Sequence, residues 1–172
     1  MIKIVTTALI LIITLPTEIP WKSSNQLKWS DFKREPLKSS EYFAMTNSGI
    51  KYSWSSSFDG TSYAFSFEVN SYFNPNESWV KKGKQTDELL NHEQLHFNIS
   101  ELHARSLRSK LNNFEFTDDF KTEIDSIYNL VRKEENDAQD LYDNETNHSL
   151  NKEEQKRWNK LIKAELKVSE LK

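Results

Sequence analysis

The chain has 172 residues, no cysteine and a formal net charge of −3 at pH 7. This composition excludes disulfides, thiol nucleophiles and thiolate metal ligands, and the charge supplies no basic surface that would gather the phosphates of a nucleic acid. Aromatic residues make up 12% of the chain and glycine occurs only three times, which favours a packed globular protein over a disordered one.

The first twenty residues have the pattern of an export signal. Lys3 precedes an apolar run from Ile4 to Leu15, and a polar stretch with prolines follows. A run of this length fits the roughly 7–15 residues of a signal core and is short of the ~20 needed to span a bilayer. We therefore predict a signal peptide or short N-terminal anchor at residues 1–20. Residues 21–172 are predicted to form one exported domain, periplasmic or extracellular, with no strong membrane association after signal removal.

Two alternating segments then predict an antiparallel β-hairpin. Residues 50–58 and residues 61–73 both alternate apolar side chains with small or polar ones. The pair Asp59-Gly60 between them tolerates positive φ and predicts a tight turn. Because one face of this hairpin would be rich in aromatic side chains, we expect helices to cover it.

From Thr86 onward the apolar period is helical. One helix is predicted to run from a cap at Thr86 or Asp87 to about residue 111, a second from about residue 119 to 142, and a third to begin after Asn151. Residues 143–149 are predicted to form the loop between the last two helices. The fold class is therefore α+β, with an N-terminal antiparallel β-sheet whose hairpin packs on three C-terminal helices.

The first predicted helix carries the sequence HEQLH at residues 92–96. Histidines four residues apart lie about 40° apart around a helix and ~6 Å along it, so His92 and His96 can bind one ion. Glu93 can reach a water on that ion without binding the ion itself. This pattern is typical of zinc hydrolases, in which Zn2+ lowers the pKa of its water toward ~7 and the glutamate acts as general base. A solvated helix with two surface histidines is the alternative.

A zinc enzyme needs a third protein ligand and an open fourth position. His103 is excluded, because it lies roughly 10 Å along the helix axis beyond the HExxH pair. The loop after the second helix offers His148 and Glu145. A neutral imidazole adds no second buried charge, so His148 is favoured and Glu145 is the alternative. Tyr142 and Asp143 nearby are further alternative ligands, or could orient a ligand or stabilise an oxyanion, or could end the preceding helix.

Several separated motifs resemble one bacterial protein family. They are LKWSDF, AMTNSGIKY, ESWV, HEQLHFNISELHARSLR and YDNETNHSLNKEEQKRW, which together span about residues 27–166. The chain resembles the family called domain of unknown function 922, whose members are described as secreted zinc-dependent proteases. The resemblance implies a zincin-like fold, Zn2+ as cofactor, the two histidines of HEQLH as ligands and Glu93 as general base. It also implies that the loop with Glu145 and His148 supplies the third ligand.

These predictions lead to one preferred function and two alternatives. The preferred function is a secreted zinc-dependent metallopeptidase that hydrolyses peptide or protein substrates, including those of the cell envelope. An amidase acting on cell-wall peptide would use the same site, because the pocket walls and not the metal set substrate choice. The third hypothesis is a noncatalytic envelope protein that binds a partner through its aromatic sheet and long helices, with structural zinc or none.

Overall fold

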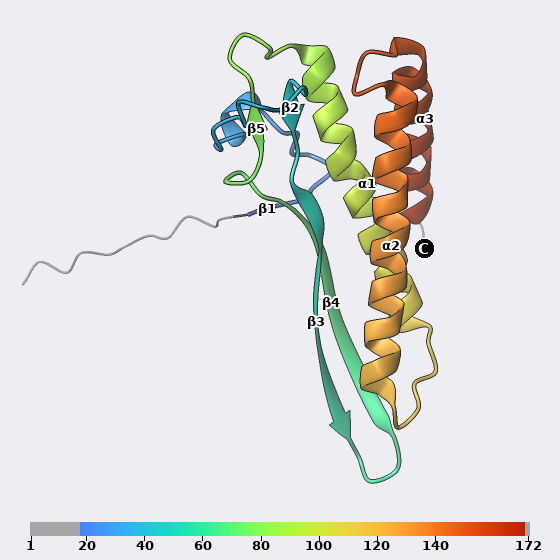
Figure 1. Ribbon diagram of the computed structural model, residues 1–172. Helices are drawn as coiled ribbons and strands as arrows, with labels where there is room; N and C mark the ends of the chain where they lie inside the picture. The colour runs from blue at the N-terminus through green and yellow to red at the C-terminus, as the bar shows by residue number, and fades with distance from the viewer. Residues whose placement is uncertain (1–17, 171–172) are drawn as a thin grey trace, which may run out of the picture.

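Short strands and one long hairpin precede three helices along the chain. The computed structural model describes residues 18–170. The elements are β1 (Ile19–Pro20), a 3-10 turn (Trp29–Asp31), β2 (Ala44–Met45), β3 (Ser48–Phe58), β4 (Tyr63–Phe73), β5 (Trp79–Val80), α1 (Asp87–Asn112), α2 (Phe120–Thr146) and α3 (Lys152–Ser169). The predicted α+β class is confirmed, with antiparallel strands first and three helices after them (Figure 1).

The signal prediction for residues 1–20 lies mainly outside the described residues. Of that segment, the structure describes only residues 18–20, and Ile19 and Pro20 form the short strand β1. Across residues 18–170, none of the helices is both long enough and apolar enough to cross a bilayer.

Strands β3 and β4 form the predicted hairpin, in register from Ser48 opposite Phe73 to Phe58 opposite Tyr63. Strand β1 pairs with the other edge of β4, and β2 pairs with β5 in a separate two-stranded sheet. The hairpin turn is longer than predicted, because residues 59–62 form it and, of these, only Gly60 has positive φ. The Asp59 carboxylate accepts hydrogen bonds from the backbone N–H groups of Thr61 and Ser62, which stabilises the longer turn.

The helices lie along one side of the hairpin, as Figure 1 shows. The core between them holds Leu107 and Leu111 of α1, Ile124 and Val131 of α2, and Val69 of β4, all of them buried. The aromatic face of the hairpin packs against this core, so the expected cover is present. Of the two predicted caps, Thr86 is the one present, since its side chain accepts a hydrogen bond from the Leu89 N–H and Asp87 is the first residue of α1.

Helix α2 extends one turn beyond its predicted end at Tyr142. Residues 143–146 are helical, so the prediction of a loop there is wrong for these four residues. They include no glycine or proline that would stop the helix, and the Thr146 hydroxyl donates to the Tyr142 carbonyl oxygen at 2.7 Å within the last turn. Asp143 is therefore held on a helix and not on a loop.

Three consecutive residues after α2 are left-handed. Asn147, His148 and Ser149 have φ values of 47°, 49° and 76°. A left-handed conformation costs an L-residue roughly 1–2 kcal/mol, whereas glycine adopts it without strain. Glycine also gives the unfolded chain more conformational entropy, which lowers the stability of the folded protein by about 0.4–1 kcal/mol. We expect Ser149→Gly to raise the free energy of unfolding in urea by about 0.5–1 kcal/mol. Ser106→Gly, inside α1, should lower it by a similar amount, and a destabilised Ser149→Gly protein would contradict the argument.

Candidate metal centre

Helix α1 directs two imidazoles toward one point. His92 and His96 lie one turn apart, their Nε2 atoms are 3.2 Å apart, and their rings meet edge to face at an interplanar angle of 88°. His92 is 3% exposed, so this part of α1 is not a solvated surface. Two nitrogen donors thus converge in a buried place on the inner face of the helix.

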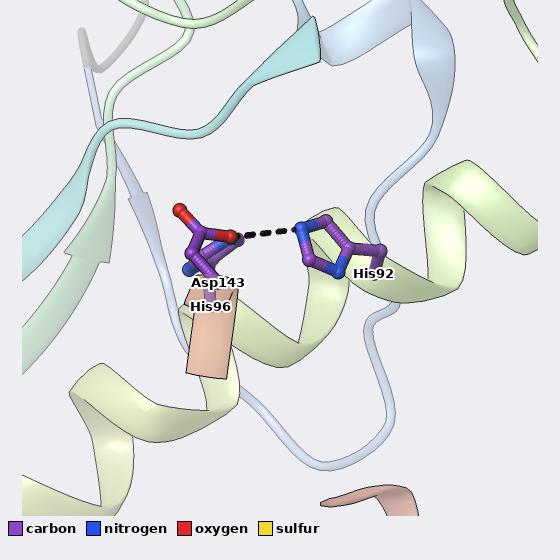
Figure 2. A group of neighbouring side chains, drawn as sticks. All are labelled: His92, His96 and Asp143. Carbon is purple, nitrogen blue, oxygen red and sulfur yellow. Dashed lines mark hydrogen bonds and ion pairs between the residues drawn. The ribbon is translucent and has the colours of Figure 1, made fainter. Parts of the chain in front are cut away.

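Asp143 of α2 completes a group of three donors (Figure 2). Its Oδ1 atom lies 3.1 Å from the Nε2 atom of His92 and 3.1 Å from that of His96. The three atoms form a nearly equilateral triangle. Bonds of ~2.0–2.1 Å to a tetrahedral zinc ion would place ligand atoms about 3.3 Å apart, so the triangle fits one face of such a site. Two imidazoles and one carboxylate are also a donor set that zinc accepts.

Charge on Asp143 is strongly favoured by its partners. Burial alone would raise the pKa of Asp143, but the hydrogen bonds to His92 and His96 outweigh it and hold this pKa well below its usual range. Burial likewise opposes the charged form of His96, but the contacts with Asp143 and the nearby charge of Glu93 raise its pKa overall. The centre therefore contains an ionised carboxylate that favours a cation.

Glu93 lies beside the triangle with an unsatisfied carboxylate. The residue is 3% exposed, and within residues 18–170 no group hydrogen-bonds its Oε2 atom. A charged oxygen that is buried without a hydrogen-bond partner costs on the order of several kcal/mol of folding free energy, which is more than a neutral polar group costs in the same place. Such a group calls for a specific explanation, and its position at the pocket of the candidate centre supplies one.

His148 and Glu145, the two predicted third ligands, lie in different places. The Nδ1 atom of His148 is 3.5 Å from Asp143 Oδ1, and its ring packs on Tyr42 at a centroid distance of 4.4 Å. Glu145 points elsewhere, because its carboxylate accepts from the indole N–H of Trp158 at 2.7 Å and pairs with Arg157. The structure thus brings His148 to the edge of the centre, and it does not bring Glu145 there.

Tyr142 lies behind the histidines and not in front of them. Its ring packs on His92 at 4.7 Å and on His96 at 4.9 Å, and its hydroxyl lies 3.2 Å from the His92 carbonyl oxygen, to which it donates. Full burial raises the pKa of Tyr142, so the phenol stays neutral. These contacts suit a residue that orients the ligand helix.

A pocket of about 190 Å³ opens directly over the triangle. One wall is the segment that contains β2, and the other walls come from α1, α2 and the left-handed turn after α2. The lining residues are Tyr42, Phe43, Ala44, Met45, Thr46, Leu89, His92, Glu93, His96, Asp143 and His148. The wall opposite the triangle is mostly apolar, and the charged groups gather at its floor.

Sequence reasoning missed two residues that contact the histidines from behind. Gln155 Oε1 lies 3.0 Å from His92 Nδ1, and Gln139 Oε1 lies 2.6 Å from His96 Nδ1. Gln139 is four residues before Asp143, so helical spacing could have placed both on one face of α2. No such signal connects Gln155 to the site, because it lies on α3.

The fold and the site together define a class: an α+β protein with a His–His–Asp centre and a buried glutamate beside it. A family model described as bacterial protein of unknown function (DUF922) matches residues 16–149. The match covers most of the chain, and the chain therefore belongs to this family. The matched residues include the three donors, Glu93 and His148, whereas α3 lies beyond the match. Neither a curated protein nor a solved structure matches the chain.

Proposed function

We propose that this protein is a secreted zinc-dependent metallohydrolase of zincin-like type, and specifically a peptidase. The observation that carries the proposal is the coincidence of two features: three donor atoms at tetrahedral spacing, and an unpaired buried carboxylate beside them. A buried polar atom without a hydrogen-bond partner is uncommon in folded proteins. Together they supply the two groups that hydrolysis by water requires, a cation site and a base.

His92, His96 and Asp143 would hold the ion. Bound zinc would supply Lewis acidity, which lowers the pKa of water and polarises a carbonyl group. Asp143 is the third ligand in this proposal because its Oδ1 atom is equally close to both histidine nitrogens. His148, predicted from the sequence as that ligand, is the next nearest donor.

Glu93 would act as the general base. Its Oε2 atom has no hydrogen-bond partner among residues 18–170 and the residue lines the pocket, so this oxygen is free to accept a proton from the attacking water. The same carboxylic acid would then deliver that proton to the leaving amine nitrogen. A carboxylate committed to an ion pair could not perform this transfer without first breaking the pair.

His148 would act from the wall of the pocket. Its side chain is 39% exposed and faces the same pocket as Glu93. From there an imidazole N–H could donate to the carbonyl oxygen of the substrate as negative charge develops on it. Packing on Tyr42 and the left-handed backbone would fix the ring in place for this task.

The pocket favours a peptide substrate over a small charged metabolite. Apart from the charged groups of the centre and His148, its walls carry no acidic or basic side chain. The volume of about 190 Å³ is below the roughly 300–1,000 Å³ typical of small-molecule sites, so it would accept one residue of a longer chain. An exported enzyme of this kind would meet peptides and proteins of the cell envelope. An amidase acting on cell-wall peptide would use the same residues in the same roles and would differ only in which amide bond it cleaves.

One observation favours a second candidate function. His148 Nδ1 is 3.5 Å from Asp143 Oδ1, so a small movement could make it a fourth ligand. A zinc ion with four protein ligands is structural and leaves no position for substrate. The protein would then be a noncatalytic envelope protein that binds a partner.

Metal analysis combined with a peptidase assay tests the proposed function. The protein, purified without chelator, should contain one zinc ion per chain and should cleave a mixture of unstructured peptides. Dipicolinate should remove both zinc and activity, and added zinc should restore both. Zinc that binds tightly without any hydrolysis would support the structural site, and absence of zinc would overturn the proposal.

A further inference from the structure

Both histidines of the centre are held from behind by a glutamine, and each glutamine comes from a different helix. Gln139 of α2 contacts His96, and Gln155 of α3 contacts His92. In both cases the contacting atoms are the amide oxygen Oε1 and the ring nitrogen Nδ1. An amide oxygen can only accept a hydrogen bond, so each Nδ1 atom must carry the proton.

The assignment of a proton to each Nδ1 atom depends on which amide atom, oxygen or nitrogen, faces the ring. Further contacts of each amide decide its orientation. Gln139 Nε2 donates to the His96 carbonyl oxygen at 2.9 Å and lies 3.3 Å from the hydroxyl of Ser100. Turning this amide over would place its oxygen against the carbonyl oxygen and its N–H2 group against the ring. The Gln139 amide therefore has one favourable orientation.

The Gln155 amide is oriented by a different partner, because its Nε2 atom donates to Asn159 Oδ1 at 3.1 Å. The Tyr142 hydroxyl lies 2.7 Å from Nε2 and 3.0 Å from Oε1, so it fits either orientation of this amide. The residue is only 8% exposed, so water could not readily replace these contacts. Its Oε1 atom is left facing the ring of His92.

We propose that Gln139 and Gln155 are positioning residues that lock His96 and His92 in the Nδ1–H tautomer and so present both Nε2 lone pairs to the metal. The proposal deepens the proposed function, since it assigns the groups that prepare the site for the cation. A ligand histidine needs its free nitrogen unprotonated and its ring fixed, and the hydrogen bond on the other nitrogen does both.

The use of amides has a consequence for the ion. A carboxylate behind a ligand histidine raises the basicity of that ligand, whereas a neutral amide orients the ring with less effect on its basicity. Asp143 is the one charged donor, so a zinc ion held here would keep more of its positive charge than in a site backed by carboxylates. Two glutamines therefore combine a fixed geometry with a strongly electrophilic cation.

The test compares Gln139→Met and Gln155→Met with Gln139→Glu and Gln155→Glu. Methionine keeps the length of the side chain but removes the acceptor, whereas glutamate keeps an acceptor oxygen for the Nδ1–H group. Tautomers are read from the 15N shifts of the ring nitrogens in metal-free protein at a pH where the imidazoles are neutral. Zinc affinity is measured by competition with a chromophoric chelator.

In the metal-free wild type the Nδ1 atom of each ring should carry a proton, whether or not the Nε2 atom also donates to Asp143. Each methionine variant should show a mixture of tautomers at the one histidine it contacts and should bind zinc about 10–100-fold more weakly. The glutamate variants should restore the single tautomer and bind zinc at least as tightly as the wild type.

Gln94→Met is the matched control. Gln94 is a buried glutamine of α1 that accepts a hydrogen bond from the Leu27 N–H, away from both histidine rings. The variant should lose stability but keep both tautomers and the zinc affinity. Unchanged tautomers in the Gln139→Met and Gln155→Met proteins would overturn the inference, whatever their stability. Absence of zinc from the wild type would overturn the proposed function instead, and the tautomer measurement would still decide the role of the glutamines.

Discussion

Glu93→Gln is expected to leave zinc in place and to lower kcat for peptide hydrolysis by about 10²–10⁴-fold. The substitution keeps the shape of the side chain but removes the group that accepts the proton of the attacking water. Zinc content is expected to be unchanged, because Glu93 is not among the three donors that converge within the centre. The measurement is kcat with zinc content determined on the same preparation.

Glu88→Gln is the control for this prediction, because Glu88 is an exposed carboxylate in the first turn of the same helix. Its activity should stay near that of the wild type. A Glu93→Gln protein with full activity would disprove the role of Glu93 as base.

Asp143→Ala is expected to weaken zinc binding by more than about 100-fold, whereas His148→Ala should keep zinc within a few-fold and lose activity. The first change removes a donor that contacts both histidines, and the second removes a group on the pocket wall. Zinc affinity is measured by chelator competition, and unfolding in urea checks that each variant is folded.

Glu145→Gln is the control for this pair, because its carboxylate contacts Trp158 and Arg157 and not the centre. Its zinc affinity should equal that of the wild type. The reverse pattern, in which His148→Ala loses zinc and Asp143→Ala retains it, would establish His148 as the third ligand. Equal loss in both variants would indicate a closed shell of four ligands and would favour the structural site.

The parts of the fold that depend on local patterns could be predicted from the sequence. Alternation predicted the hairpin, and the cap at Thr86 marked the start of the helix that carries HEQLH. Strand β2 could not be predicted, because two residues show no period and this strand exists only through its pairing with β5. The end of α2 was predicted one turn early, because a left-handed turn without glycine gives no sequence signal.

The same reasons explain what was predicted of the candidate centre. The pair His92 and His96 follows from helical spacing alone. Asp143 was predicted as a possible alternative ligand or as a residue that orients one, and it was ranked below His148 because it was placed in a loop and not on α2. Gln139 and Gln155 depend on how α2 and α3 pack on α1, which no local pattern encodes.

The centre joins parts of the chain that are distant in sequence, since His92 and Asp143 are 51 positions apart. A polypeptide that is still extended would hold no complete set of donors. Metal uptake would therefore follow folding, and for a secreted protein of the kind proposed it would take place after export. The bound ion would then stabilise the native state by mass action and would clamp the end of α2 onto α1. In a compartment depleted of zinc, this end of the helix pair would open first, while the distant hairpin core would remain closed.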